Sequence, residues 1–208
     1  MEILKVFKEN KEIIKKIKES LEKGKIIVFP TDTVYGLICN ARNEKATKKI
    51  FKIKKREKKK PLGIFVRNIK MAKKFAEIDK EKEKFLEKIW PGKMTIIFKR
   101  KGKLPKILFG KQKTIGIRIP DYKLIKDLFF KINFPLAQTS ANISGKEAPT
   151  DIKKVLAYFR NQKEKPDLIL DKGVLKKAKA STVLDLSGKT PKILRKGEIS
   201  EKNILKLM

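Results

Sequence analysis

Two stretches of the chain combine hydroxyl, amide and glycine residues with a complete absence of lysine and arginine. They span residues 26–41 and 132–145 of a 208-residue chain that carries 55 Lys plus Arg. A long ammonium side chain is rarely buried without a partner, so both stretches are expected to face the protein interior. In each, apolar residues give way to small polar ones, as at the strand ends where open α/β sheets bind ligands. Buried strands with ordinary polar turns are the alternative interpretation.

The second stretch concentrates hydrogen-bonding groups that suit a phosphate or an adenine. Thr139, Ser140, Asn142 and Ser144 lie within six residues, and their hydroxyl and amide groups are enough to surround such a ligand. A turn without function has a similar composition. In the first stretch, Thr33 of the segment PTDTVYG is placed to orient a small polar substrate.

Arginine is scarce, and three arginines occupy informative positions. Arg56 lies in the run KKREKKK, just before a predicted strand, while Arg118 and Arg195 lie at predicted strand ends. A guanidinium presents a planar fork of donors to phosphate and carboxylate oxygens. These three residues are therefore candidate anion-binding groups, although a charge run is more often a solvated face.

Histidine is absent, and cysteine occurs once, as Cys39. A Ser-His-Asp triad, a Cys-His pair and an imidazole metal site are thereby excluded. One cysteine also excludes an intramolecular disulfide, a CxxC redox pair and a cysteine-rich zinc cluster. Cys39 is expected to be a small buried hydrophobic residue.

The formal net charge of +32 invites a nucleic-acid partner, because Lys and Arg that neutralise phosphates supply most non-specific affinity. Seven of the 55 cations are arginine, however, and the lysines are scattered along almost every segment. Lysine enrichment is also typical of hyperthermophile surfaces. Two interpretations of the charge therefore stay open: a tRNA or RNA contact through the basic surface, and a lysine-rich surface that is merely solvated.

Helical and strand periodicities alternate along the chain, which predicts a layered α/β architecture. No linker interrupts the pattern, so we expect one domain, residues 1–208. Four residues are expected helix caps: Asn10, Asn43, Thr150 and Ser200. The other expected helices span residues 69–76, 80–89 and 121–131, and the expected strands span residues 25–29, 62–66, 94–99, 114–120, 135–138, 168–170, 181–186 and 192–195.

The first eleven residues mix acids and bases and lack the apolar stretch of a signal peptide. No apolar run approaches the roughly 20 residues that cross a bilayer. The expectation is a cytoplasmic protein without a membrane partner.

Six motifs occur together in one order: PTDTVYGL, the triplet KKR followed by KPL, TIGIRIP, TSANISG, STVLDL and ILRKGEIS. In this the chain resembles YrdC-type L-threonylcarbamoyladenylate synthases, over roughly residues 24–200. The resemblance implies an α/β fold (α+β in some schemes) of the YrdC-like three-layer type, a twisted mixed β-sheet flanked by helices. It also implies the short form, with a single catalytic domain.

The activity implied by the resemblance is that of a nucleotidyltransferase. L-threonine, bicarbonate and ATP would give threonylcarbamoyl-AMP and pyrophosphate. Mg²⁺ would accompany ATP without a protein metal ligand, and a downstream tRNA threonylcarbamoyltransferase machinery would use the product to form threonylcarbamoyladenosine in tRNA.

The family's signatures carry over to ten residues of this chain. Lys54, Arg56, Ser140 and Asn142 match the catalytic positions; Arg56, Lys60, Thr114, Ser140, Asn142 and Arg195 match ATP contacts; Thr33, Arg118 and Ser181 match L-threonine contacts. The chain departs from the family at four places: Phe65 replaces a frequent His, Lys60 a frequent Asn, Lys196 a frequent Pro, and Ala148 a Ser.

Two other functions stay open at this point. One is a module that binds double-stranded RNA or tRNA through the basic surface without catalysis. The other is that of the related carbamoyltransferase maturation proteins, in which a similar domain makes a carbamoyl-adenylate from carbamoyl phosphate. This alternative is disfavoured, because those proteins carry the domain within a much longer chain.

Overall fold

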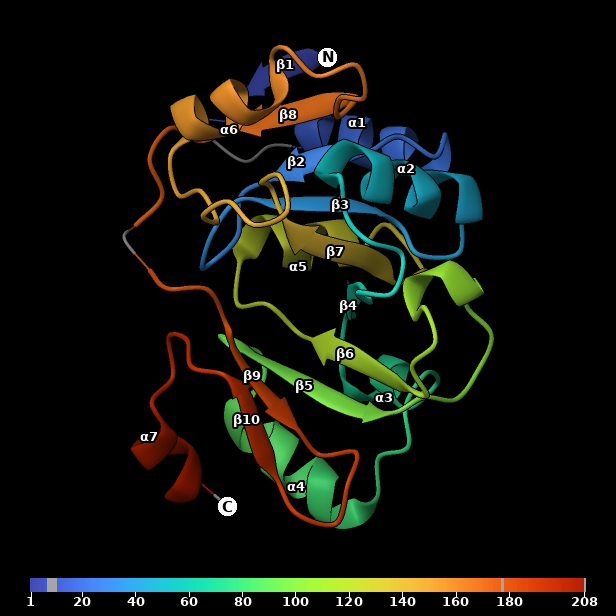
Figure 1. Cartoon of the computed structure of the whole chain (residues 1–208), viewed down its shortest axis with the longest axis vertical. Helices are drawn as coiled ribbons and strands as arrows, with labels where there is room; N and C mark the ends of the chain where they lie inside the picture. The colour runs from blue at the N-terminus through green and yellow to red at the C-terminus, as the bar shows by residue number, and fades with distance from the viewer. Residues whose placement is uncertain (7–10, 177, 208) are drawn as a thin grey trace.

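One twisted mixed sheet runs through the whole molecule (Figure 1). The structure is a computed structural model that describes residues 1–6, 11–176 and 178–207. Within these residues the sheet has ten strands in the order β1-β8-β2-β3-β7-β4-β6-β5-β9-β10. Their bounds are β1 Glu2–Lys5, β2 Ile27–Phe29, β3 Gly36–Asn40, β4 Gly63–Phe65, β5 Met94–Lys99, β6 Thr114–Arg118, β7 Leu136–Ser140, β8 Leu168–Asp171, β9 Thr182–Asp185 and β10 Lys192–Arg195.

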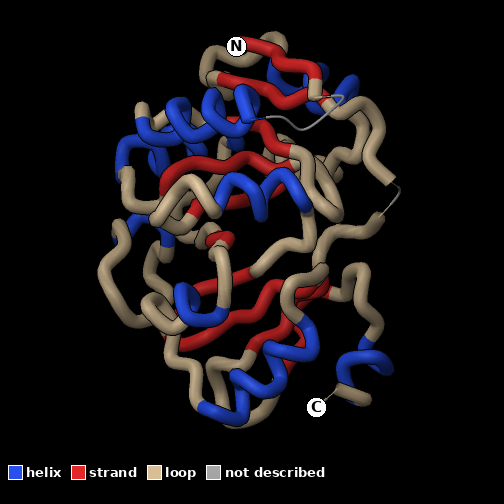
Figure 2. The backbone as a smooth tube through the Cα atoms, turned by 180° about the vertical axis from the view of Figure 1, so that it is seen from behind, coloured by secondary structure: helices blue, strands red, loops and turns tan. Residues whose placement is uncertain are grey.

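Helices cover the two faces of the sheet unequally. They are α1 Lys11–Glu22, α2 Glu44–Lys54, α3 Ile69–Ala72, α4 Lys80–Ile89, α5 Lys123–Phe129, α6 Ile152–Phe159 and α7 Glu201–Leu205, with a 3₁₀ turn at Lys106–Leu108. In Figure 1, α2 lies in front of β3, whereas α1 and α5, which contact each other, lie behind the sheet and come forward in Figure 2. Along the described chain, no helix crosses the front of β5 and β6 in this view.

Local signals explain where the helices begin and end. The side chain of Asn43 accepts a hydrogen bond from the Ala46 amide at 2.9 Å and starts α2. Ser200 accepts from the Asn203 amide at 3.3 Å and starts α7. Gly24, with a φ of +71°, follows α1 in the left-handed region that glycine adopts without steric cost. The caps expected at Asn43 and Ser200 are thus confirmed.

Several sequence-based expectations differ from the structure. The cap of α6 is Asp151 and not Thr150: the Asp151 carboxylate accepts from the Lys153 amide at 2.9 Å. The helix expected over residues 69–76 ends at Ala72, because the chain turns there to bring Ala76 into an isolated bridge with Arg100. β1 and β3 were not predicted. The cap expected at Asn10 lies outside the described residues.

The two lysine-free stretches meet in the middle of the sheet. β3 pairs antiparallel with β7, and Gly36 lies opposite Ser140 in the register. The loop before β3 and the loop after β7 therefore lie at the same edge. Cys39 on β3 is fully buried, and this burial raises the pKa of its thiol to about 12, which makes it an inert core residue as expected.

Among the described residues, no helix combines the length and the apolar character that a membrane crossing needs.

Candidate active site

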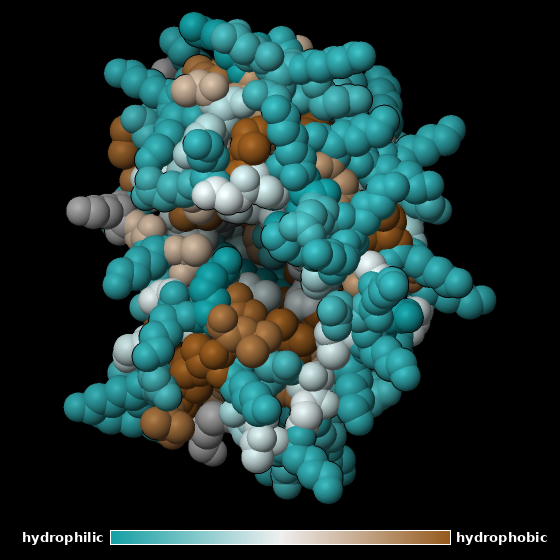
Figure 3. All heavy atoms as spheres, viewed as in Figure 1, coloured by the Kyte–Doolittle hydropathy of each residue, from teal (hydrophilic) through white to brown (hydrophobic). Residues whose placement is uncertain are grey.

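A cleft of about 330 Å³ opens at the middle of the sheet, where β3 and β7 face β6, β5 and β9. Figure 3 shows this face hollowed at mid-height, with hydrophobic atoms gathered just below the hollow. Six of the ten predicted site residues line the cleft, and they come from six separate segments of the chain: Thr33, Arg56, Arg118, Ser140, Ser181 and Arg195.

The loop between β2 and β3 is rigidified by a threonine turn. The Thr31 hydroxyl accepts from the amides of Thr33 and Val34 at 3.1 and 3.2 Å and bonds the Val34 carbonyl at 2.7 Å. Such side-chain bonds to the following backbone stabilise a turn that is neither helix nor strand. The turn fixes Thr33, whose buried hydroxyl lies 3.1 Å from that of Thr31.

Arg118 ends β6 inside the cleft and is 3% exposed. Its Nη2 donates to Asp32 at 2.6 Å, its Nη1 to the Thr33 hydroxyl at 3.1 Å and its Nε to the Gly92 carbonyl at 2.8 Å. Burial lowers the pKa of Arg118, and the charge of Asp32 opposes this effect. Asp32 is not among the residues predicted from the sequence, although it is the only acidic residue in the two lysine-free stretches.

Ser181 and Arg195 form the wall contributed by β9 and β10. Arg195 donates from Nε and Nη2 to the Ser181 carbonyl at 3.0 and 2.7 Å, and from Nη2 to the Ser181 hydroxyl at 3.1 Å. The Ser181 hydroxyl also lies 2.9 Å from that of Thr95 on β5, a cleft residue that the sequence analysis missed. Partial burial lowers the pKa of Arg195. Its guanidinium thus faces the cleft in a fixed orientation.

Arg56 lines the opposite side, just after α2. It donates from Nε to the Lys60 carbonyl at 3.0 Å and from Nη2 to the Pro61 carbonyl at 2.9 Å. These bonds curl the cationic run into a loop that presents Arg56, and partial burial lowers the pKa of Arg56. Lys60 itself is exposed, pairs with Glu57 at 2.8 Å and does not line the cleft.

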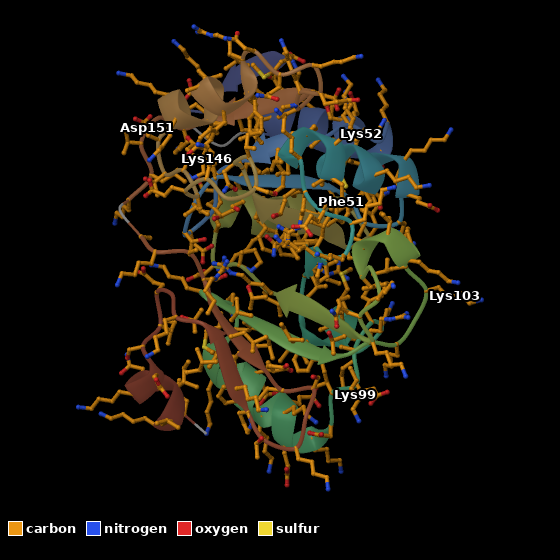
Figure 4. The ribbon with its side chains drawn as sticks, in the orientation of Figure 1. Phe51, Lys52, Lys99, Lys103, Lys146 and Asp151 are labelled. Carbon is orange, nitrogen blue, oxygen red and sulfur yellow. The ribbon has the colours of Figure 1, made fainter. Side chains whose placement is uncertain are left out.

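Lys54 and Asn142 lie behind the cleft wall and hold Ser140. Lys54 is 1% exposed, and its ammonium donates to the Ser140 carbonyl at 2.6 Å, the Asn142 carbonyl at 2.8 Å and the Asn142 Oδ1 at 2.9 Å. The Ser140 hydroxyl donates to the same Oδ1 at 2.6 Å. Asn142 also donates to the carbonyl of Lys146, which Figure 4 labels. Burial, with a smaller effect of Arg56, lowers the pKa of Lys54 to about 7.

Thr114 also lies outside the cleft lining. It begins β6 opposite Lys99, while Gly116, two residues further along that strand, does line the cleft. Direct nucleotide contact by Thr114, Lys60, Lys54 or Asn142 stays a prediction. The arrangement of the last two supports an indirect role, since both brace the loop that carries Ser140.

The cleft suits a ligand with anionic and apolar parts. Three arginines line it, and no acidic residue of the described chain does. Phe65, Ile97 and Val183 add an apolar surface, and the Phe65 ring centroid lies 5.9 Å from the Arg118 guanidinium carbon, within cation–π range. Carboxylate and phosphate oxygens are the ligands that paired guanidinium donors bind best.

Comparison with known proteins decides the family. A family model described as "Telomere recombination", of Sua5, YciO and YrdC, matches residues 19–197. The chain belongs to the Sua5/YciO/YrdC family.

Relatives and solved structures of the Sua5/YciO/YrdC family agree with this assignment. A Methanocaldococcus jannaschii relative is 40% identical over 95% of this chain and 93% of its own length. A Pyrococcus abyssi threonylcarbamoyl-AMP synthase is 34% identical over 90% of this chain, which spans only 55% of that relative.

The structure of P. abyssi Sua5 complexed with L-threonine matches all of this chain at 33% identity with a TM-score of 0.92, over 61% of that protein. Escherichia coli YciO matches 98% of both chains at 26% identity and a TM-score of 0.86. The expected mixed sheet flanked by helices is confirmed.

Proposed function

We propose that the chain is an L-threonylcarbamoyladenylate synthase, a nucleotidyltransferase that makes threonylcarbamoyl-AMP and pyrophosphate from L-threonine, bicarbonate and ATP. The observation that carries the proposal is the convergence of Arg56, Arg118 and Arg195 on one cleft together with Thr33 and Ser181. Relatives named threonylcarbamoyl-AMP synthase, and a similar structure complexed with L-threonine, support it.

The cleft offers separate places for the two larger substrates. Arg118, Thr33 and Ser181 lie at one end and take the carboxylate and hydroxyl of threonine. Arg56 and Ser140 also line the cleft and take the nucleotide phosphates, together with Arg195, which is hydrogen-bonded to Ser181. The ends of the reacting molecules are thereby held close, which lowers the entropic part of the barrier.

The chemistry needs no strong general base. The neutral threonine amine and bicarbonate condense with loss of water to a carbamate, which is already an anionic nucleophile. Its oxygen attacks the α-phosphorus while pyrophosphate leaves. Arg56 and Arg195 stabilise the charge that develops on the phosphoryl group and the leaving pyrophosphate. Lys54 and Asn142 keep Ser140 in place for this step.

Mg²⁺ would enter with ATP and neutralise phosphate charge. Within the described residues no group of His, Cys, Asp or Glu could hold a metal ion, and no carboxylate lines the cleft. A magnesium ion that enters in this way would be held through the substrate phosphates and water, as this ion prefers.

The product would pass to a downstream tRNA threonylcarbamoyltransferase machinery. A contact with tRNA through the basic surface is compatible with the charge of +32.

The test is mass spectrometry of the protein with Mg-ATP, bicarbonate and L-threonine, each omitted in turn, while pyrophosphate is followed in parallel. A threonylcarbamoyl-AMP peak that needs all three substrates is expected. Arg56→Ala and Ser140→Ala are each expected to slow adenylate formation by about 100-fold or more. Arg160→Ala, at an exposed arginine outside the cleft, is the matched control and should retain activity.

Two outcomes would contradict the proposal. Turnover near that of the unmodified protein in both the Arg56 and Ser140 variants would refute the assignment of the cleft. If neither ATP nor L-threonine binds, while RNA binds with an affinity that falls steeply with salt, the chain is an RNA-binding module.

A further inference from the structure

Asp32 is a carboxylate buried beside the cleft but outside its lining. Its side chain is 8% exposed, and that of its partner Arg118 is 4% exposed. Asp32 faces a separate hollow that is also lined by Gly92 and Asp121. Its ion pair with Arg118 connects the Asp32 carboxylate to the cleft lining.

Three acceptors surround the Arg118 guanidinium, each at a different nitrogen. Asp32 takes one N–H of Nη2, the Thr33 hydroxyl takes one of Nη1, and the Gly92 carbonyl takes that of Nε. A guanidinium has five N–H groups. One N–H therefore remains on each terminal nitrogen, and Arg118 lines the cleft.

Asp32 is the one charged member of this set and is itself held in place. Its Oδ2 accepts from the Asp121 amide at 3.2 Å, so the carboxylate is anchored on both oxygens. All three bonds have a charged donor, but only the bond to Asp32 joins two opposite charges. Asp32 therefore contributes more to the orientation of Arg118 than either neutral acceptor does.

We propose that Asp32 is a positioning residue that aligns the Arg118 guanidinium for the carboxylate of L-threonine. The inference rests on the proposed function, because it assumes that L-threonine occupies this end of the cleft. Asp32 holds one edge of the guanidinium and leaves an N–H on each terminal nitrogen for the substrate carboxylate.

The experiment measures binding of two probes by calorimetry, without turnover. L-threonine carries the carboxylate, and L-threoninamide lacks its charge. The unmodified protein should prefer L-threonine. In Asp32→Asn the affinity for L-threonine should fall about tenfold or more, which is the size of effect seen when a residue that orients a metal-ligating side chain is removed. The affinities for L-threoninamide and ATP should stay within about twofold of those of the unmodified protein.

Matched variants separate positioning from a general structural effect. Asp127→Asn removes an acid that pairs with Lys123 on the surface of α5, and should bind both probes like the unmodified protein. In an Arg118→Gln background, Asp32→Asn should cause no further loss of L-threonine affinity, because Asp32 acts through Arg118. Asp32→Glu keeps the charge but displaces the carboxylate, and should lose L-threonine affinity even if Asp32→Asn does not fold.

The outcomes that overturn the proposal are distinct from failure of the proposed function. If the unmodified protein binds no L-threonine, the proposed function fails and this inference fails with it. Normal L-threonine affinity in Asp32→Asn, or in Asp32→Glu where the former does not fold, would refute the positioning role alone. So would a parallel loss of ATP and L-threonine affinity, which is the signature of a general structural defect.

Discussion

Replacing Lys54 by methionine tests how the fold carries a buried ammonium group. Methionine keeps an unbranched chain of similar length but has no charge and no donor. The three acceptors that Lys54 serves, two carbonyls and the Asn142 amide oxygen, then lose their partner. These three acceptors match the three N–H groups of an ammonium, which favours the charged form of Lys54. Burial has the opposite effect and favours the neutral amine.

The pKa of Lys54 gives the expected size of the effect. The value falls from 10.5 to about 7, a difference that corresponds to about 5 kcal/mol between the two protonation states. Between these pH values the unfolded chain holds a proton that the folded chain has released. The free energy of unfolding must then rise with pH in this window, at up to about 1.4 kcal/mol per pH unit. Below about pH 7 both states are protonated and the contribution of Lys54 is constant.

The assay is equilibrium unfolding in urea from about pH 6 to about pH 10. The free energy of unfolding of the unmodified protein, minus that of Lys54→Met, should be level below pH 7 and should climb above it. Lys52→Met is the control, because Lys52 lies on the exposed side of α2 with its ammonium 3.8 Å from Glu164 (Figure 4). Its difference curve should stay flat. A flat curve for Lys54→Met would refute the reasoning, because the three acceptors would then keep the ammonium charged throughout.

Two further substitutions test the backbone and the hydrogen bonds that complete the cleft. In Gly197→Ala, the new Cβ would lie 2.3 Å from the Ala180 carbonyl oxygen; we expect a loss of about 1 to 3 kcal/mol in urea unfolding and weaker L-threonine binding by calorimetry. Gly188→Ala, whose nearest neighbouring atom is 3.9 Å away, is the control, and equal stability of the two variants would contradict the close approach. In Tyr35→Phe, the buried hydroxyl that donates to the Gly173 carbonyl at 2.9 Å and accepts a backbone amide at 3.0 Å is lost. Urea unfolding should show a loss of about 1 to 3 kcal/mol, and an unchanged midpoint would show that these two bonds contribute nothing.

The helices could be predicted from the sequence wherever one capping residue precedes an apolar face. Asn43 and Ser200 are such residues, and the helix expected over 80–89 has those bounds in the structure. Thr150 and Asp151 are adjacent and both suit a cap. The choice between them depends on the isolated bridge of Asp151 with Val174, a contact that local sequence does not show.

The strands missed by the sequence analysis depend on distant partners. β3 is a short apolar segment that directly follows the polar loop of Thr33, and it becomes a strand by pairing with β7, about 100 residues later. β1 pairs with β8 in the same way across an even longer separation. Short strands of this kind owe their stability to non-local contacts and side-chain burial more than to intrinsic preference.

The candidate site could be predicted in part. Six of the ten residues that the six-motif resemblance named line the cleft. The resemblance could not show which matched residues turn away from it. Lys54 points at the carbonyls of Ser140 and Asn142, a direction set by the folded loop and not by residue type. Asp32 was not predicted, although the sequence held a sign of it. An acid in a buried stretch without lysine or arginine needs a cationic partner from another part of the chain.

The order of the strands bears on how the cleft is assembled during synthesis. β8 and β9 follow one another along the chain, yet they stand second and ninth in the sheet. A nascent chain that has just completed β8 already contains Thr33, Arg118 and Ser140, but the wall formed by Ser181 and Arg195 has not been made. Pairings between such distant segments form slowly because the intervening chain must first be closed into a loop. The ribosome must therefore release residues 181–195 before the cleft gains its third arginine.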